Sequence, residues 1–89
     1  MVLTGDFNTV PDSAAHRLLS AGLADAWDAA KTRSGPAETF HGFSGKADRR
    51  IDWVFAKGLP AVKAETVTFG RNGRYPSDHF PVAVDYRWP

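Results

Sequence analysis

With 89 residues, the chain can form at most one small domain, because a chain of this length buries only about 60–65% of its unfolded surface. Apolar residues make up 43% of the sequence and charged residues 24%, which excludes a disordered chain, and the net charge of +1 does not predict nucleic-acid binding. There is no cysteine and no apolar run near the ~18 residues of a membrane span, which excludes disulfides, thiolate metal sites and a membrane helix.

The first part of the sequence predicts a strand followed by a helix. Residues 1–5 (MVLTG) are expected to form the strand. The helix is expected to run from Asp12 or Ser13, either of which can cap it, to about Ala21, and Gly22 can end it. The side chains predicted to face the core share one helical stripe: Ala15, Leu18, Leu19 and Gly22.

A second, shorter helical turn is predicted within ADAWDAAK, residues 24–31. Asp25 can cap this turn, and Trp27 is expected to be buried. We interpret the charges of Asp25 and Asp28, like those of the lysines, as solvated surface groups.

The remaining sequence predicts a long loop and then strands. Residues 32–49 are loop-like, although TFHGF within them can form a short strand. Strands are expected at 49–56 (RRIDWVFA), 61–70 (AVKAETVTFG) and 80–88 (FPVAVDYRW), with an Asn-Gly turn in the loop at 71–79. Apolar side chains are expected on one face of the first and last of these strands: Ile51, Trp53 and Phe55, and Phe80, Val82, Val84 and Tyr86.

This order of elements indicates an α+β fold in which helices cover one face of a sheet. The other face would then need cover from outside the chain, because Trp53, Phe55 and Tyr86 are costly to leave in contact with water. We therefore expect one layer of a sandwich.

Polar side chains are concentrated in four short stretches near strand ends. GDFN carries Asp6 and Asn8, and RIDW carries a carboxylate, Asp52, in a strand whose opposite face is apolar. An unpaired carboxylate is costly in such a position. The other two stretches add an acid and two histidines: Asp78 and His79 in SDH, and His41 in TFHG.

Each stretch also has a purely structural explanation. Asp6 can cap a turn, and Asn8 can adopt a left-handed turn conformation. Asp52 can form an exposed salt bridge with Arg49 or Arg50, worth at most about 1 kcal/mol. SDH, flanked by prolines, fits an ordinary turn, and the histidine of TFHG fits an ordinary loop.

In combination, these motifs resemble the carboxy-terminal half of the endonuclease/exonuclease/phosphatase family, the deoxyribonuclease I-like metal-dependent phosphoesterases. That half shows GDFN, an R-I-D-aromatic strand and a terminal SDH-x-P-V, which stand here in the same order at 5–8, 50–53 and 77–82. Residues 39–43 and 73–82 also look like a bacterial subgroup of hydrolases in the family. The resemblance implies that residues 1–89 are half of such a domain, one layer of an α/β sandwich.

The resemblance also implies roles for the site residues. The carboxylate matching Asp6 orients or deprotonates the attacking water, and the amide matching Asn8 helps to position it. The imidazole matching His79 contacts phosphoryl oxygens, and Asp52 is expected to pair with it from a neighbouring strand and to raise its pKa. Asp78 is expected to lie near a divalent cation, Mg²⁺ or Mn²⁺, since these ions prefer oxygen ligands.

Loops at 33–49 and around RNGRY are expected to flank the substrate phosphate. Their possible substrate contacts are His41, Arg71 and Arg74.

The chain also departs from the family pattern. The chief metal-binding glutamate lies upstream in the family, and the two glutamates here, Glu38 and Glu65, stand in no matching motif. We therefore expect weak metal binding and slow turnover. The chain can be a fragment of a longer enzyme, or a half-domain that forms a homodimer by burying a large apolar sheet face against a second copy.

Three functions remain open at this point. The first is a Mg²⁺-dependent phosphoesterase that hydrolyses phosphodiesters or phosphomonoesters, nucleic acids among them. The second is a catalytically inactive scaffold or binding module that retains the fold. The third, least supported by the net charge, is a nucleic-acid binder that uses the arginines. If the chain is complete, we expect a cytoplasmic protein with no membrane association.

Overall fold

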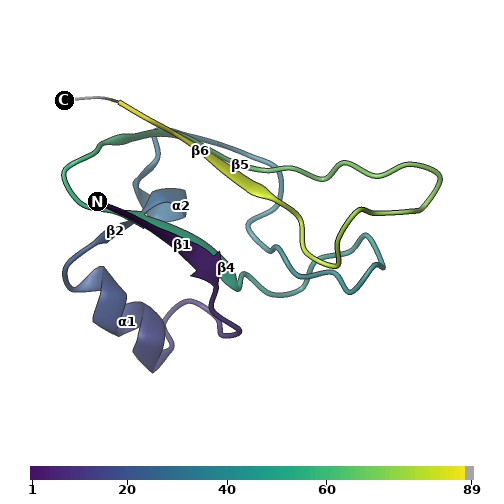
Figure 1. The fold of residues 1–89 in the computed structure, drawn as a ribbon, viewed down its shortest axis with the longest axis horizontal. Coiled ribbons are helices and arrows are strands. Elements are labelled where there is room, and N and C mark those ends of the chain that lie inside the picture. Colours follow the sequence, from purple (N-terminus) through teal and green to yellow (C-terminus); the bar gives the residue numbers. More distant parts are fainter. Residues whose placement is uncertain (88–89) are drawn as a thin grey trace.

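The computed structural model describes residues 1–87, so Trp88, which was predicted to end the last strand, lies outside the described residues. The strands are β1 (Val2–Asp6), β2 (Ala24–Asp25), β3 (Thr32–Ser34), β4 (Asp52–Ala56), β5 (Ala61–Thr66) and β6 (Val82–Tyr86). The helices are α1 (Ala14–Ser20) and α2 (Ala26–Ala29). Figure 1 shows the chain as an elongated molecule, with the strands toward one end and long loops at the other.

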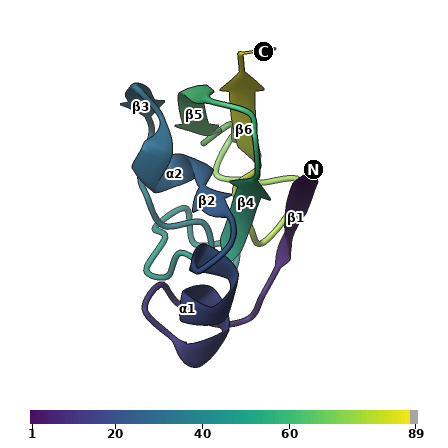
Figure 2. The ribbon, with the colours of Figure 1, turned by 90° about the vertical axis from the view of Figure 1, so that its left-hand side faces the viewer.

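The α+β class is confirmed, and the strands divide into two three-stranded sheets. The first has the order β1-β4-β2 and the second β3-β5-β6, and among residues 1–87 only the β3–β5 pair is parallel. Figure 2 shows the second sheet above the first, with α1 below the first sheet. The single sheet expected from the sequence does not form, because β1 and β2 occupy both edges of β4 and leave none for β5.

The two faces of β4 pack against different parts of the molecule. Trp53 and Phe55 lie on the face toward α1 and are 1% and 0% exposed. The ring of Phe7 stacks on Trp53 with 4.6 Å between the ring centroids, and the ring of His16 meets Trp53 edge-on at 4.7 Å. Cover for Trp53 and Phe55 was expected from outside the chain, but Phe7 and α1 provide it, so these two side chains do not require a second copy.

The opposite face of β4 contributes to a small core between the sheets. Its buried members are alanines: Ala26, Ala30, Ala61 and Ala64. Larger, partly buried side chains complete it: Trp27, Val54, Val84 and Tyr86. The small buried residues let α2 approach β5 closely, and Trp27 is half-buried rather than fully buried as predicted.

Helix α1 begins where the sequence predicts, but it turns a different face inward. Ser13 caps it by accepting a hydrogen bond from the backbone N–H of His16. The predicted apolar stripe is largely exposed, and Leu18 is 77% exposed, whereas His16 is buried. The reason is a buried hydrogen bond, 2.7 Å long, between His16 Nε2 and Asp25 Oδ2, which fixes the helix face that points toward β4.

Asp25, which was interpreted as a solvated charge, is 5% exposed. Its carboxylate accepts hydrogen bonds from both terminal nitrogens of Arg50, at 3.2 and 2.7 Å, and from the backbone N–H of Trp27. Burial raises the pKa of Asp25, but the hydrogen bonds from Arg50 and His16 outweigh this effect and hold the pKa below its usual range. We call His16, Asp25 and Arg50 the buried cluster.

Within residues 1–87, no helix is long and apolar enough to cross a membrane.

Candidate active site

The carboxylates of Asp6 and Asp52 are brought together by the pairing of β1 with β4. These strands run antiparallel, and their register places Asp6 directly opposite Asp52 at one end of the ladder. Directly opposite residues in an antiparallel pair lie close enough for their side chains to interact. Two carboxylates side by side repel each other unless a proton or a cation lies between them.

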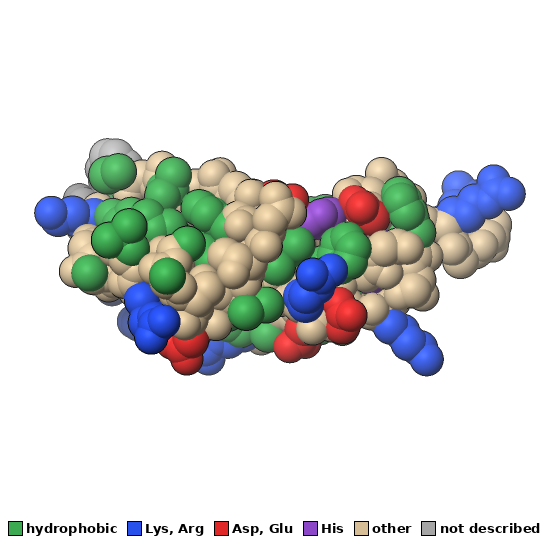
Figure 3. Space-filling view, turned by 90° about the horizontal axis from the view of Figure 1, so that it is seen from below, with side chains coloured by type: hydrophobic (Ala, Val, Ile, Leu, Met, Phe, Trp, Pro, Cys, Tyr) green, Lys and Arg blue, Asp and Glu red, His purple; other side chains and the backbone are tan. Residues whose placement is uncertain are grey.

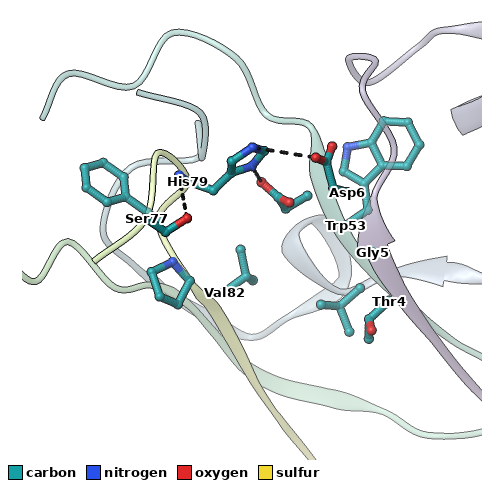
Figure 4. Close-up of a pocket in the computed structure, with 11 residues that line it drawn as sticks. Thr4, Gly5, Asp6, Trp53, Ser77, His79 and Val82 are labelled. Carbon is teal, nitrogen blue, oxygen red and sulfur yellow. Dashed lines mark hydrogen bonds and ion pairs between the residues drawn. The ribbon is translucent and has the colours of Figure 1, made fainter. Parts of the chain in front are cut away.

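The imidazole of His79 lies between these carboxylates. Its Nδ1 lies 2.7 Å from Asp52 Oδ2, and its Nε2 lies 3.6 Å from Asp6 Oδ2 and 3.8 Å from Asp78 Oδ1. Figure 4 shows the ring of His79 reaching toward Asp6, with a dashed line marking the contact between them. From the sequence, His79 and Asp52 were expected on neighbouring strands. Instead, His79 lies on the loop that precedes β6, and β6 belongs to the other sheet. We call Asp6, Asp52 and His79 the open cluster.

The carboxylates govern the protonation of His79. The hydrogen bond to Asp52 raises the pKa of His79 above its usual value; partial burial opposes this, and the negative charges of Asp52, Asp6 and Asp78 add to the increase. Because a carboxylate can only accept, the hydrogen bond places a proton on Nδ1. When the ring carries its second proton, Nε2 is a donor pointing toward Asp6.

Local turns orient the Asp6 and His79 side chains. Asp6 Oδ1 accepts a hydrogen bond of 2.9 Å from the backbone N–H of Asn8, which adopts a left-handed conformation with φ of 52°. This turn was the structural explanation considered for GDFN, and it leaves Asp6 Oδ2 directed toward His79. Similarly, Ser77 Oγ accepts a hydrogen bond of 3.1 Å from the backbone N–H of His79.

The open cluster lies at the edge of a cavity of about 290 Å³. The rest of the cavity lining is mostly apolar and comes from β1, β4 and the chain entering β6: Thr4, Gly5, Trp53, Val54, Ser77, Phe80, Pro81 and Val82. Figure 3 shows a histidine between acidic side chains on one face of the molecule, with hydrophobic surface beside it. A substrate here could therefore place a polar group at the cluster and an apolar group alongside, and an anionic group would need the protonated imidazole or a cation to offset the carboxylates.

The structure does not bring all predicted site residues to this cavity. His41 is 5% exposed, and its ring stacks on Phe80 with 4.2 Å between centroids. Arg71 and Arg74 face each other across the predicted Asn-Gly turn of an exposed loop. That loop projects at one end of the long axis in Figure 1, and basic side chains mark this end in Figure 3. Substrate contact by these three residues stays a prediction.

Asp52 does not form the salt bridges considered for it. Arg50 pairs with Asp25 at 2.7 Å, and Arg49 pairs with Asp48 at 3.7 Å. The partner of Asp52 is His79.

A divalent cation could be held only by part of this set. Ligand atoms from Asp6, Asp52 and His79 lie within 4.8 Å of one another. However, Asp52 Oδ2 and His79 Nδ1 are already engaged with each other, which leaves Asp6 as the freer carboxylate of this group. The half-exposed Asp78 lies outside the group, with its Oδ1 3.8 Å from His79 Nε2. So few free carboxylates suit at most a weakly held Mg²⁺ or Mn²⁺ whose coordination is completed by water and phosphate oxygens.

Two residues near the cluster were not singled out by the sequence: Thr39 and Phe40. The Thr39 hydroxyl accepts hydrogen bonds from the start of β4, and the ring of Phe40 meets His79 edge-on at 5.3 Å. The signals available were their position beside His41 in TFHGF and the resemblance of residues 39–43 to a bacterial subgroup of the family.

An α+β chain whose carboxylates converge on one imidazole beside an open cavity has the groups that hydrolytic chemistry requires. The chain belongs to the Endonuclease/Exonuclease/phosphatase family, whose sequence profile matches residues 1–79. Comparison with curated protein sequences gave no match.

Solved structures support this assignment. A functionally unknown conserved protein from Enterococcus faecalis V583 superposes with a TM-score of 0.88 at 29% identity, over 97% of this chain and 35% of its own. A mannosyl-6-phosphatase from Bacteroides thetaiotaomicron gives 0.83 at 29% identity, over 98% and 37%. An endonuclease/exonuclease/phosphatase from Bacteroides vulgatus gives 0.86 at 26% identity, over 99% and 36%. The chain thus spans little more than a third of the length of these proteins.

Proposed function

We propose that this chain carries the imidazole–carboxylate part of a metal-dependent phosphoesterase site, which hydrolyses phosphodiesters or phosphomonoesters with an activated water. The observation that carries the proposal is the position of His79, held by Asp52 at 2.7 Å and directed at Asp6 from beside an open cavity. Family membership and the likeness to a mannosyl-6-phosphatase support the reaction class.

In this proposal, His79 binds the phosphoryl group. A protonated imidazole donates from Nε2 to an oxygen on which negative charge grows in the transition state. Asp52 keeps the ring in the orientation and tautomer that this donation needs, and it raises the pKa of His79 so that the ring stays protonated closer to neutral pH.

Asp6 is the proposed base for the attacking water. Its Oδ2 atom faces the same space as His79 Nε2, and its Oδ1 atom is held by the turn at Asn8. A carboxylate fixed within reach of a phosphate-bound water can orient the water and accept its proton. Asn8, whose side chain is exposed, is proposed to help position that water.

Asp78 is the proposed ligand of Mg²⁺ or Mn²⁺. When bound, such an ion supplies positive charge to the phosphoryl oxygens. Within residues 1–87 no glutamate joins the open cluster, so we expect the ion to bind weakly and turnover by the chain alone to be slow.

Hydrolysis of an aryl phosphodiester and an aryl phosphomonoester tests this proposal. The chain is incubated with Mg²⁺, and its rate is compared with that of His79→Ala. We expect the loss of His79 to remove most of the measured rate, by a factor of about 10²–10³ if its role is transition-state stabilisation. Lys63→Ala, an exposed change on β5, serves as the control and should keep the rate of the unsubstituted chain. Equal rates for the chain and His79→Ala, or no rate above buffer for either, would instead favour an inactive scaffold or binding module.

A further inference from the structure

The Asp52–His79 pair joins two parts of the chain that share no strand pairing. Asp52 begins β4 in the first sheet, and His79 precedes β6 in the second. The hydrogen bond of 2.7 Å between them requires that these two segments be held at a defined separation. Within residues 1–87, the sheets themselves provide no direct β4–β6 ladder that could do this.

A short segment, residues 39–42, lies between the two. Phe40 forms isolated antiparallel bridges with Arg49 on one side and with His79 on the other. On the β4 side, the backbone N–H groups of Thr39 and Phe40 donate to the carbonyl of Arg49, at 2.8 and 3.0 Å. On the other side, the N–H of Phe80 donates to the carbonyl of Thr39 at 2.7 Å.

Within this segment, the side chain of Thr39 contacts the backbone of Asp52. It is 1% exposed, and its hydroxyl accepts hydrogen bonds of 3.3 Å from the backbone N–H groups of Ile51 and Asp52. Strand β2 pairs with β4 only near Phe55 and Ala56, so the Asp52 end of β4 lacks a strand partner on that side. The Thr39 hydroxyl takes the place of that partner.

The same segment also fixes the residues around the imidazole. The backbone N–H groups of His41 and Gly42 both donate to the carbonyl of Asp78, at 2.9 and 3.0 Å. The ring of Phe40 meets the ring of His79 edge-on, with 5.3 Å between the centroids and 72° between the planes. Residues 39–42 therefore contact both members of the pair.

We infer that Thr39 is a positioning residue: its hydroxyl fixes the start of β4 so that the Asp52 carboxylate meets Nδ1 of His79. The TFHG motif then serves the site through its backbone and through Thr39. The importance of this contact for turnover rests on the proposed function. The geometry of the contact can be tested without measuring hydrolysis.

The test is the tautomer of the neutral His79 ring in the Thr39→Val variant. Long-range ¹H–¹⁵N spectra, recorded in metal-free buffer at a pH above the pKa of His79, distinguish a proton on Nδ1 from one on Nε2. The unsubstituted chain should carry the proton mainly on Nδ1, because that atom faces a carboxylate. In Thr39→Val the start of β4 loses its acceptor, and we expect the Nδ1–H population to fall and the Nε2–H population to rise.

Two control variants separate positioning from general stabilisation. Thr66→Val makes the same change at a residue that is 2% exposed and whose hydroxyl has no hydrogen-bond partner among residues 1–87, so it should leave the tautomer unchanged. Thr39→Ser keeps the hydroxyl and should also leave it unchanged. A tautomer in folded Thr39→Val equal to that in Thr66→Val would overturn the inference, whatever the loss of stability.

If Thr39→Val does not fold, Thr39→Cys provides the comparison with Thr39→Ser. The two side chains differ in one atom, and a thiol is a much weaker acceptor than a hydroxyl. Thr39→Cys should shift the tautomer in the same direction, and identical spectra for the two variants would also overturn the inference.

Discussion

Two clusters in this molecule pair a histidine with an aspartate at 2.7 Å, and they differ in what surrounds the pair. In the buried cluster, the side chains of His16 and Asp25 are 8% and 3% exposed. In the open cluster, those of His79 and Asp52 are 22% and 21% exposed and border the cavity. The same two chemical groups thus occupy a closed interior and an accessible surface.

Charge separates the clusters more clearly than burial. Arg50 neutralises Asp25 in the buried cluster and occupies the space that a cation would need, although His16, Asp25 and Asp28 have the spacing of metal ligands. Around His79, three carboxylates converge, and among the described residues no lysine or arginine pairs with them. In the buried cluster the charge of Asp25 is neutralised by Arg50, whereas the open cluster has negative charge left to attract a proton or a cation. This difference indicates a structural role for the first and a chemical role for the second.

The largest expected effect is the loss of Arg50 from the buried cluster. Arg50→Met leaves the Asp25 carboxylate buried with a single histidine, and removing one partner of a buried ion pair typically costs about 3–5 kcal/mol. We expect the free energy of unfolding to fall by that amount, as measured by urea denaturation followed by tryptophan fluorescence. A chain of this size has little stability to spare, so Arg50→Met can be largely unfolded in the absence of urea.

The neighbouring arginine provides the matched control. The Arg49 side chain is 52% exposed and its partner Asp48 is 76% exposed, so Arg49→Met should change the free energy of unfolding by no more than about 1 kcal/mol. Equal losses for the two variants would show that the buried cluster is not the structural element described here.

Exchange of each histidine for glutamine should give a smaller difference in the free energy of unfolding between the two clusters. His16→Gln removes a hydrogen bond to a buried charged group, and we expect a loss of about 1.5–3 kcal/mol in the free energy of unfolding. His79→Gln acts on a partly solvated pair and should cost less than about 1 kcal/mol. Urea denaturation of the two variants at one pH measures the difference, and a larger loss for His79→Gln would reverse the assignment of structural and chemical roles.

The sequence predicts the open cluster well because its members are tied to local signals. Asp6, Asp52 and His79 each lie in a short motif next to a strand, and the strands follow from alternating apolar residues. Pairing of β1 with β4 then brings Asp6 and Asp52 together, whereas His79 reaches them through the bridges that Phe40 forms with His79 and with Arg49. The roles that the family resemblance gives to these residues still depend on the experiments proposed above.

The buried cluster could not be predicted in the same way. Asp25 meets an arginine 25 positions away, and nothing in the local sequence distinguishes it from an exposed acid such as Asp28. Periodicity failed for α1 for a related reason: the helix buries His16, which has a specific partner, and exposes Leu18. Apolar patterns predict where a strand or helix lies, but a buried polar contact between distant residues can decide which face turns inward.

The smallest expected effect concerns the pH response of the open cluster. The Asp52 hydrogen bond raises the pKa of His79 above the value of about 6.5 for a free imidazole, so Asp52→Asn should lower that pKa. A raised pKa in the folded state means that the protonated pair stabilises the protein fully below about pH 6.5 and that this contribution is lost as the pH rises through the folded pKa. The difference in unfolding free energy between the unsubstituted chain and Asp52→Asn should therefore shrink as the pH rises.

NMR titration of the His79 ring protons measures this shift directly. Asp85→Asn makes the same change in charge at an exposed position on β6, outside the open cluster, and should leave the His79 midpoint nearly unchanged. If Asp52→Asn and Asp85→Asn titrate alike, Asp52 does not control the proton on His79. The open cluster would then lose the feature that sets it apart, since a carboxylate that does not hold the imidazole protonated cannot prepare it to bind a phosphoryl oxygen.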